Sequence, residues 1–197
     1  SLSLGEVSTG LIYVFGLLFG NYILSLPLTI YATFILEGRF GFNKTTRATF
    51  VTDQLKTVLL TALIGGPLLA GILLIFQNVP DAWLWAWVTF SVFVLAITYL
   101  APSLIMPLFN KFEPMEEGAL KDAIYNMAKE CEFPLTEITV MDGSRRSAKS
   151  NAFFMGFGKN KKIALYDTLV ENHSTEELVA VLAHEIGHFK RKHIIQR

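Results

Sequence analysis

The sequence predicts a mainly α-helical fold, a polytopic transmembrane helix bundle that carries a small α+β domain. The chain has 197 residues, of which 52% are hydrophobic and 17% are charged. The charges are unevenly distributed, because residues 1–110 hold eight of them and residues 111–197 hold 26. The first part is therefore predicted to lie in a membrane, and the second to form a polar domain outside it.

Three runs without any charged residue occupy the first part, at 7–36, 57–80 and 82–110. Each exceeds the roughly 20 apolar residues that a helix needs to cross a bilayer. A buried core helix is the alternative for one such run, but three in a chain of this size favour membrane helices. The Gly-Gly-Pro sequence at 65–67 is expected to interrupt or kink the second helix, and Pro102 and Pro107 are expected to do so near the end of the third.

Basic residues in the loops predict the orientation of these helices. The loop at 37–56 holds four Lys or Arg residues, and the turn at 78–81 holds none. Because cytoplasmic loops carry the excess of basic residues, the first loop is expected in the cytoplasm and the turn outside. The third helix then returns the chain to the cytoplasmic side, where residues 111–197 form the α+β domain.

The polar domain is predicted to contain one helix, one strand and one hairpin ahead of its last helix. Residues 111–135 are expected to be helical, because apolar residues recur at helical spacing from 116 to 132, and Pro134 closes that helix. A short strand is expected at 137–141, ended by an Asp-Gly turn. Two apolar runs at 152–157 and 162–166 resemble a β-hairpin, which the last helix is expected to follow directly.

The polar domain carries thirteen charges of each sign and is electrically neutral. Without net positive charge or aromatic stacking residues beside its basic side chains, it is not expected to bind nucleic acid. The basic side chains could instead face the anionic headgroups of the lipid bilayer. These side chains are Arg145, Arg146, Lys149, Lys159, Lys161 and Lys162.

The last predicted helix carries the strongest chemical signal. Ser174 and Glu177 fit a capping box at its N-terminus. His184, Glu185 and His188 form an H-E-x-x-H motif, whose two histidines lie one helical turn apart on the same face. Both imidazoles could bind one zinc ion, and Glu185 could accept a proton from the attacking water. This pattern indicates a zinc-metalloprotease domain; the alternative is a chance motif in which Glu185 pairs with a basic residue.

A catalytic zinc ion normally has three protein ligands. His193 lies nine residues beyond His184, about 180° around the helix from it, and is expected to have a surface role instead. His173 precedes the capping box and is expected in a loop. We therefore expect the third ligand to come from sequence outside this chain, which would make the chain part of a larger protease and inactive alone.

The hairpin ahead of the motif suggests where a substrate binds. Proteases commonly hold an extended peptide as an added strand along an exposed sheet edge. The candidate substrate-binding residues are Asn151, Ala152 and Phe153, of which Asn151 could hydrogen-bond a peptide backbone. A second interpretation, compatible with the first, is that the hairpin packs its phenylalanines on the last helix.

Five segments together resemble the type I CAAX prenyl endopeptidases, which are integral-membrane zinc proteases. The segments are LPL at 26–28, EGRFGFNK at 37–44, PLFNKF at 107–112, SNAFF at 150–154 with GFGKNK at 156–161, and AHEIGH at 183–188. The resemblance implies a helical barrel around a water-filled chamber, with one Zn²⁺ per chain in the complete protein. It also implies His184 and His188 as zinc ligands, Glu185 as the base, and Asn151 with its neighbours along the substrate.

The resemblance further implies that the third zinc ligand is a glutamate on a later helix, to which no residue of this chain corresponds. The expected substrates are peptides or proteins, with or without a prenyl group, cleaved near their C-terminus. The expected location is a bacterial inner membrane or the ER or nuclear membrane. The alternatives are an HtpX-like quality-control metalloprotease, against which the EGRFGFNK loop argues, and a non-catalytic membrane scaffold.

Overall fold

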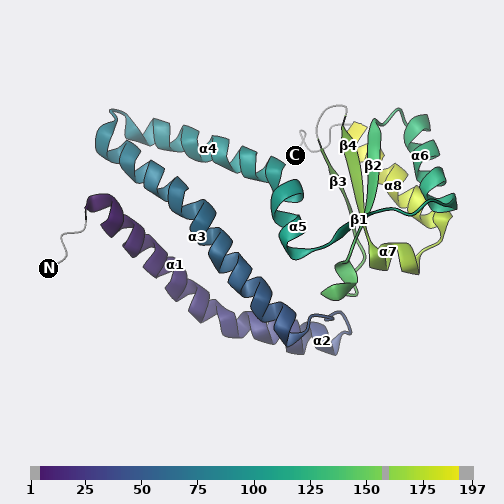
Figure 1. Ribbon diagram of the computed structural model, residues 1–197, viewed down its shortest axis with the longest axis horizontal. Coiled ribbons are helices and arrows are strands. Elements are labelled where there is room, and N and C mark those ends of the chain that lie inside the picture. Colours follow the sequence, from purple (N-terminus) through teal and green to yellow (C-terminus); the bar gives the residue numbers. More distant parts are fainter. Residues whose placement is uncertain (1–4, 157–159, 191–197) are drawn as a thin grey trace. The chain divides into compact units, whose positions relative to one another are not determined.

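The computed structural model describes residues 5–156 and 160–190, apart from the side chain of Phe189, and divides into two compact units. The first unit ends at Ala101 and contains helices only. Its elements, drawn in Figure 1, are α1 (Glu6–Ile30), the π-helical η1 (Tyr31–Leu36), α2 (Glu37–Arg39), α3 (Arg47–Asn78) and α4 (Ala82–Leu100). The π-helical η2 (Ala101–Ile105) follows α4 and leads into the second unit.

Three continuous helical stretches are long and apolar enough to cross a bilayer. They are Glu6–Arg39, Arg47–Asn78 and Ala82–Phe109, and their most apolar windows are not buried within the structure. At 1.5 Å per residue, even the shortest, with 28 residues, exceeds the roughly 30 Å thickness of the hydrocarbon core. Their apolar side chains face outward, as contact with lipid or with further membrane helices requires.

The expected helix breaks take different forms. α3 begins at Arg47, where the Thr46 hydroxyl caps it by accepting a hydrogen bond of 3.1 Å from the Thr49 N–H. It then continues through Pro67 to Asn78, so the Gly-Gly-Pro sequence does not interrupt it. Pro102 instead lies within the π-helical η2, a local widening by which helices accommodate strain.

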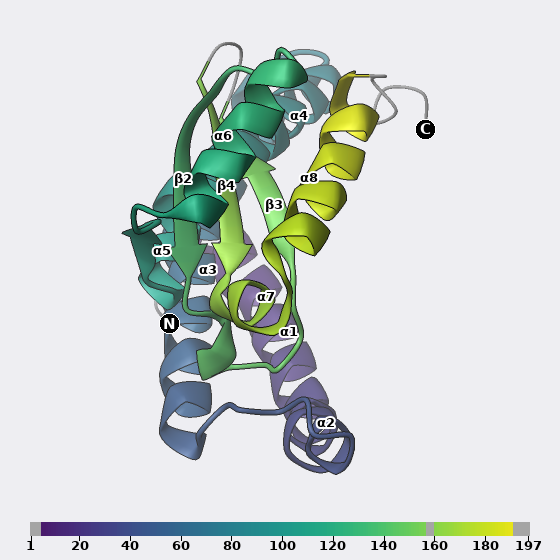
Figure 2. The same ribbon diagram turned by 90° about the vertical axis from the view of Figure 1, so that its right-hand side faces the viewer.

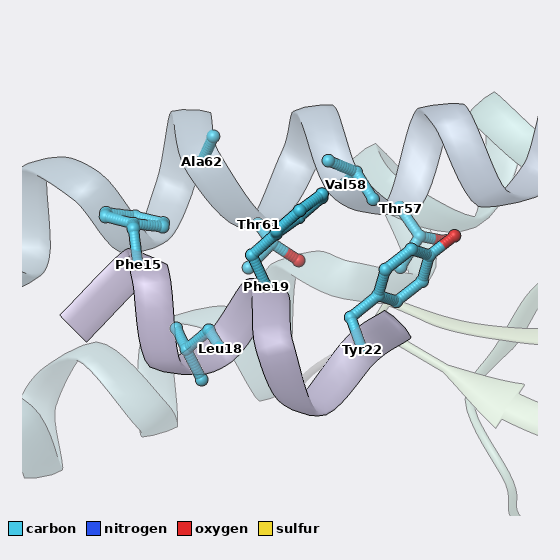
Figure 3. Close-up of a pocket in the computed structure, with 8 residues that line it drawn as sticks. All are labelled: Phe15, Leu18, Phe19, Tyr22, Thr57, Val58, Thr61 and Ala62. Atoms are coloured by element: carbon cyan, nitrogen blue, oxygen red, sulfur yellow. The ribbon is translucent and has the colours of Figure 1, made fainter. Parts of the chain in front are cut away.

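α1 and α3 contact each other closely at one point and loosely at another. At Gly10 an added Cβ would lie 2.8 Å from Leu73 Cδ1, so the glycine allows the close approach. Farther along, a cavity of about 140 Å³ separates the helices, with Phe19 and Tyr22 of α1 on one side and Val58 of α3 on the other (Figure 3). The helix pair therefore has room for side-chain movement in its middle.

The second unit is a four-stranded sheet with helices on one face. Its elements are α5 (Met106–Phe109), β1 (Phe112–Pro114), α6 (Ala119–Glu130), β2 (Leu135–Met141), the 3₁₀ turn η3 (Gly143–Arg145), β3 (Ala152–Met155), β4 (Lys161–Tyr166), α7 (Asp167–Asn172) and α8 (Thr175–Lys190). The strand order is β1-β2-β4-β3, with β2 and β4 parallel and the other pairs antiparallel. Figure 2 shows α6 lying over β2 and β4, and α8 on the side of β3.

One hydrophobic core joins these helices to the sheet. Ile163 and Leu165 of β4 are fully buried, and they pack with α6 and α8. α8 contributes Leu178, Leu182 and Ile186, which recur every four residues and therefore form one stripe along the helix. Because this stripe faces the core, the opposite side of α8 is left exposed.

The predicted hairpin is confirmed, since β3 and β4 pair antiparallel with Phe153 opposite Ala164; its turn at 157–159 lies outside the described residues. The predicted helix and strand correspond to α6 and β2. The expectation that the last helix follows the hairpin directly is wrong, because α7 intervenes. The start of the helix expected at 111–135 is also wrong, because residues 112–114 form β1 and α6 begins only at Ala119. Three residues ending in Pro114 give no alternating pattern, and proline is typical of an edge strand.

Candidate metal centre

The N-terminus of α8 is fixed by the predicted capping box. The Ser174 N–H donates to Glu177 Oε2 at 2.9 Å, and the Glu177 N–H donates to Ser174 Oγ at 3.3 Å. These two bonds satisfy backbone groups that a helix N-terminus otherwise leaves without partners. Together with the buried stripe, the cap sets the rotation of α8 and hence the direction in which its exposed side points.

His184 and His188 converge on that exposed side. Their Nε2 atoms lie 2.9 Å apart, and their rings meet edge to face with centroids 4.5 Å apart. Two nitrogens bound to one zinc ion in tetrahedral geometry, each at about 2.0–2.1 Å, would lie about 3.3 Å apart. A small rotation of either ring reaches that spacing, so the pair fits two adjacent ligand positions of zinc.

Glu185 lies beside the histidine pair and is also exposed. Helical geometry places it about 100° around the axis from His184 and about 60° from His188. Ile186, the next residue, is 1% exposed and points into the core. The carboxylate is thus next to the two imidazoles, on the solvent side of the helix, where it can accept a proton from water at the site.

No third ligand joins this pair within residues 5–156 and 160–190, where the structure shows no group of three His, Cys, Asp or Glu side chains able to hold a metal ion. His173 lies at the end of α7, with its Nδ1 atom 3.2 Å from the Leu169 carbonyl oxygen. His193 lies outside the described residues. The described part of the chain therefore holds two candidate ligands, His184 and His188, and one candidate base, Glu185.

The candidate substrate residues lie at an open sheet edge, because β3 is the last strand in the order. The Tyr166 N–H donates to the Asn151 carbonyl oxygen at 3.0 Å, so Asn151 and Tyr166 are a hydrogen-bonded pair of the antiparallel ladder. From Asn151 on, every second residue of β3 directs its backbone groups toward β4. By that alternation, the backbone groups of Ala152 and Phe154 point away from β4, toward the open edge. The Asn151 Oδ1 atom already accepts from the Ala152 N–H at 2.9 Å, which leaves the Asn151 Nδ2 group as the donor for a peptide.

The two phenylalanines of β3 lie on opposite faces of the sheet. Phe154 packs against the core and meets the ring of Phe133, with centroids 5.4 Å apart. Phe153 meets the ring of Tyr166, with centroids 6.4 Å apart, on the face opposite to that of Phe154. The interpretation that the hairpin packs phenylalanine on the helical layer therefore holds for Phe154, and it coexists with an open backbone edge.

Three of the basic residues that could have faced lipid headgroups are engaged inside the domain. Lys162 pairs with Glu137 at 2.5 Å, and Lys161 is buried and donates to the Gly156 carbonyl oxygen at 3.2 Å. Arg146 is half-buried and donates to groups at the end of α5. Arg145 and Lys149 are exposed, and Lys159 lies outside the described residues. Lipid contact is therefore not what positions Lys161, Lys162 or Arg146.

Arg146 makes a contact with the end of α5 that the sequence did not predict. Its Nη2 atom donates to the Phe109 carbonyl oxygen at 2.7 Å, and its Nη1 atom donates to Asn110 Oδ1 at 2.9 Å. These partners lie 36 and 37 residues away along the chain. A single sequence offers no local signal for such a contact.

Comparisons with known proteins agree with this geometry. The family model described as CAAX prenyl protease N-terminal, five membrane helices, matches residues 1–111, and the model of peptidase family M48 matches residues 114–197. CAAX prenyl protease 1 of Saccharomyces cerevisiae is 48% identical over 88% of this chain, and its human homolog is 33% identical over 97% of it. The crystal structure of S. mikatae Ste24p superposes on 98% of the chain with a TM-score of 0.90 and 44% identity. These matches confirm the mainly helical membrane fold with a small metallopeptidase domain.

The chain spans less than half the length of these relatives. It covers 39% of the yeast protein, 48% of the human protein and 45% of the Ste24p chain.

Proposed function

The chain belongs to the M48 peptidase family of CAAX prenyl proteases, and on this basis we propose that the protein is a zinc-dependent membrane endopeptidase. The observation that carries the proposal is the convergence of the His184 and His188 Nε2 atoms, 2.9 Å apart, on the exposed side of α8. Glu185 lies next to them on that side. Two zinc ligands and a carboxylate base are, together with a third protein ligand, the groups that zinc-assisted hydrolysis of a peptide bond uses.

In the proposed reaction His184 and His188 hold the zinc ion, one per chain, and a third protein ligand comes from outside the described residues. When bound, zinc acts as a Lewis acid toward the scissile carbonyl and lowers the pKa of the attacking water toward about 7. Glu185 accepts the proton of that water and donates it to the leaving amine. The buried stripe of α8 keeps these three side chains in place while the proton moves.

The substrate is proposed to bind as a strand added to β3. The Ala152 carbonyl oxygen and both backbone groups of Phe154, which point away from β4, would pair with it, and the Asn151 Nδ2 group would donate to one of its carbonyl oxygens. Because backbone pairing does not depend on side chains, this edge can hold peptides of varied sequence. The Phe153 backbone points toward β4, so Phe153 would contact the substrate only through its side chain, on one face of the sheet.

The substrate class follows from the relatives, whose names describe prenyl proteases acting on CAAX sequences. We infer that the peptide is cleaved near its C-terminus and that a prenyl group on it increases the rate. The basic residues of the loop at 37–56 support the inference that this loop, and with it the α+β domain, lies on the cytoplasmic side of the membrane. The alternatives, a quality-control metalloprotease and a scaffold without activity, have no observation that favours them.

The test compares three variants of the full-length protein in detergent or liposomes. Zinc bound per protein is measured by elemental analysis, and cleavage is measured on a farnesylated CAAX peptide and on its unmodified form. Glu185→Gln is expected to retain zinc and to lose at least about 1,000-fold in kcat, because the base is removed and the ligands are kept. His184→Ala and His188→Ala are each expected to lose both zinc and activity.

The control is Glu176→Gln, which changes an exposed glutamate of the same helix outside the motif. It should retain both zinc and activity. Stoichiometric zinc in His184→Ala, or full activity in Glu185→Gln, contradicts the proposal. Equal rates on the two peptides contradict only the role of the prenyl group.

A further inference from the structure

Arg146 joins the end of α5 to the loop at 142–151, which leads into β3. The last carbonyl groups of a helix lack partners within it and carry partial negative charge. The Arg146 guanidinium satisfies one of them, the Phe109 carbonyl oxygen, at 2.7 Å, and also donates to Asn110 Oδ1 at 2.9 Å. A planar guanidinium suits two acceptors at once, whereas a lysine ammonium lacks this fixed fork.

The chain segments on either side of this contact are also bonded to each other. The Lys111 N–H donates to Asp142 Oδ1 at 2.7 Å, and the Asp142 N–H donates to the Lys111 carbonyl oxygen at 3.2 Å. Phe112 then begins β1, opposite Met141 of β2. The start of the loop is therefore fixed to the residues that follow α5.

The other part of the loop is fixed to β4 and α7. Ser144 donates to the Asp167 carboxylate through both its N–H and its hydroxyl group. The Thr168 hydroxyl donates to the Lys149 carbonyl oxygen at 3.1 Å, and the Asn151 carbonyl oxygen accepts from β4 immediately before β3 begins. The loop thus connects α5 to the edge strand. The Arg146 side chain forms the two hydrogen bonds between this loop and the end of α5 that are described above.

We propose that Arg146 is a positioning residue, which fixes the edge strand β3 relative to the end of α5 and thereby aligns the peptide substrate. The inference rests on the proposed function, in which β3 receives the substrate. α8 does not depend on this contact, because Leu178, Leu182 and Ile186 hold it against the core. Loss of Arg146 should therefore displace the strand and leave the zinc ligands in place.

The test compares Arg146→Gln with Arg145→Gln in the full-length protein. Both substitutions remove one positive charge, from neighbouring residues, but Arg145 is exposed and its side chain lies outside the contact described above. For a peptide long enough to pair along β3, Arg146→Gln is expected to lower kcat/KM by about 10- to 100-fold, as small misplacements of a bound substrate do. A short peptide that reaches only the zinc site should be cleaved at an almost unchanged rate, and bound zinc should stay the same.

Hydrogen–deuterium exchange supplies a readout that does not depend on activity. The amides of residues 147–156 should exchange faster in Arg146→Gln than in Arg145→Gln or the unsubstituted protein. Arg146→Lys should restore part of the protection and part of the rate on the long peptide. Asn110→Ala, which removes one of the two acceptors, should give a smaller effect of the same kind.

Two results overturn the inference: unchanged exchange in Arg146→Gln, or an equal loss on long and short peptides together with loss of zinc, which would indicate general unfolding. Failure of the proposed function has a different signature, because the unsubstituted protein would then show no zinc-dependent cleavage. In that case the exchange measurement still decides whether Arg146 fixes β3.

Discussion

At the scale of single residues, Gly156 ends β3 in a backbone conformation that only glycine adopts without strain. Its φ is 86°, and an added Cβ would collide with the Asn160 carbonyl oxygen. We expect Gly156→Ala to lower the free energy of unfolding of the α+β domain by about 1–3 kcal/mol, because the chain must leave this conformation or bear the strain. Thermal unfolding of the purified protein measures the loss.

The matched control for this substitution is Gly118→Ala. An added Cβ there meets nothing within 4 Å, and because Gly118 is the N-cap of α6, its replacement should cost no more than about 1 kcal/mol. If the two variants unfold at the same temperature, Gly156 does not hold the hairpin in the way described.

The residues of the candidate site differ in how far sequence could identify them. His184, Glu185 and His188 could be identified because the helical period alone relates their positions, and the structure brings the two imidazoles together as that period requires. The part played by Arg146 could not, because its partners belong to another element and are fixed only when the sheet forms. Asn151 is intermediate: its place at the edge was predicted, but the bond from the Ala152 N–H to its Oδ1 atom was not.

At the scale of elements, α8 depends on its N-terminal cap as well as on its buried stripe. The Ser174 hydroxyl accepts from the Glu177 N–H, and an alanine at 174 would leave that donor to water. Ser174→Ala should therefore destabilise the domain by about 1 kcal/mol, which corresponds to roughly 4–8 °C in the unfolding temperature of a unit of this size. Thr175→Ser, at the first residue of the helix, is the control and should unfold close to the unsubstituted protein.

An unfolding temperature of Ser174→Ala equal to that of the unsubstituted protein would show that the buried stripe alone fixes the start of α8. A loss of zinc larger than the loss of stability would instead show that the cap controls the direction of the histidines.

Elements with strong local patterns were predicted, and elements that exist only through pairing were not. α6 has apolar residues at helical spacing, and Ile124, Met127 and Ala128 are the ones that become buried. β1 and α7 are three and six residues long, too short for a period to be visible. The parallel pairing of β2 with β4 was also beyond sequence reasoning, since it depends on which strands become neighbours in space.

At the scale of the whole molecule, composition separates two kinds of surface. The three helical stretches that are long and apolar enough to cross a bilayer expose apolar side chains, whereas the α+β unit buries its apolar side chains in one core. This separation was visible in the sequence because charges are almost absent from the first 110 residues. The direction in which the helices cross the membrane is a further expectation that the distribution of basic residues supports.

Counting membrane crossings turns that expectation into a test. If α3 and the stretch Ala82–Phe109 each span the bilayer, we expect the loop after α2 and the α+β domain on the same side, and the turn between α3 and α4 on the other. Single cysteines at Gly38, Pro80 and Glu116, which are all exposed, can report the side after Cys131 is replaced by serine. In sealed vesicles of known orientation, a membrane-impermeant maleimide should label Gly38→Cys and Glu116→Cys from the cytoplasmic side and Pro80→Cys from the opposite side.

Labelling of Gly38→Cys and Glu116→Cys from different sides would mean that one of the two stretches does not span the bilayer. Labelling of both from the non-cytoplasmic side would reverse the orientation that the basic loop predicts.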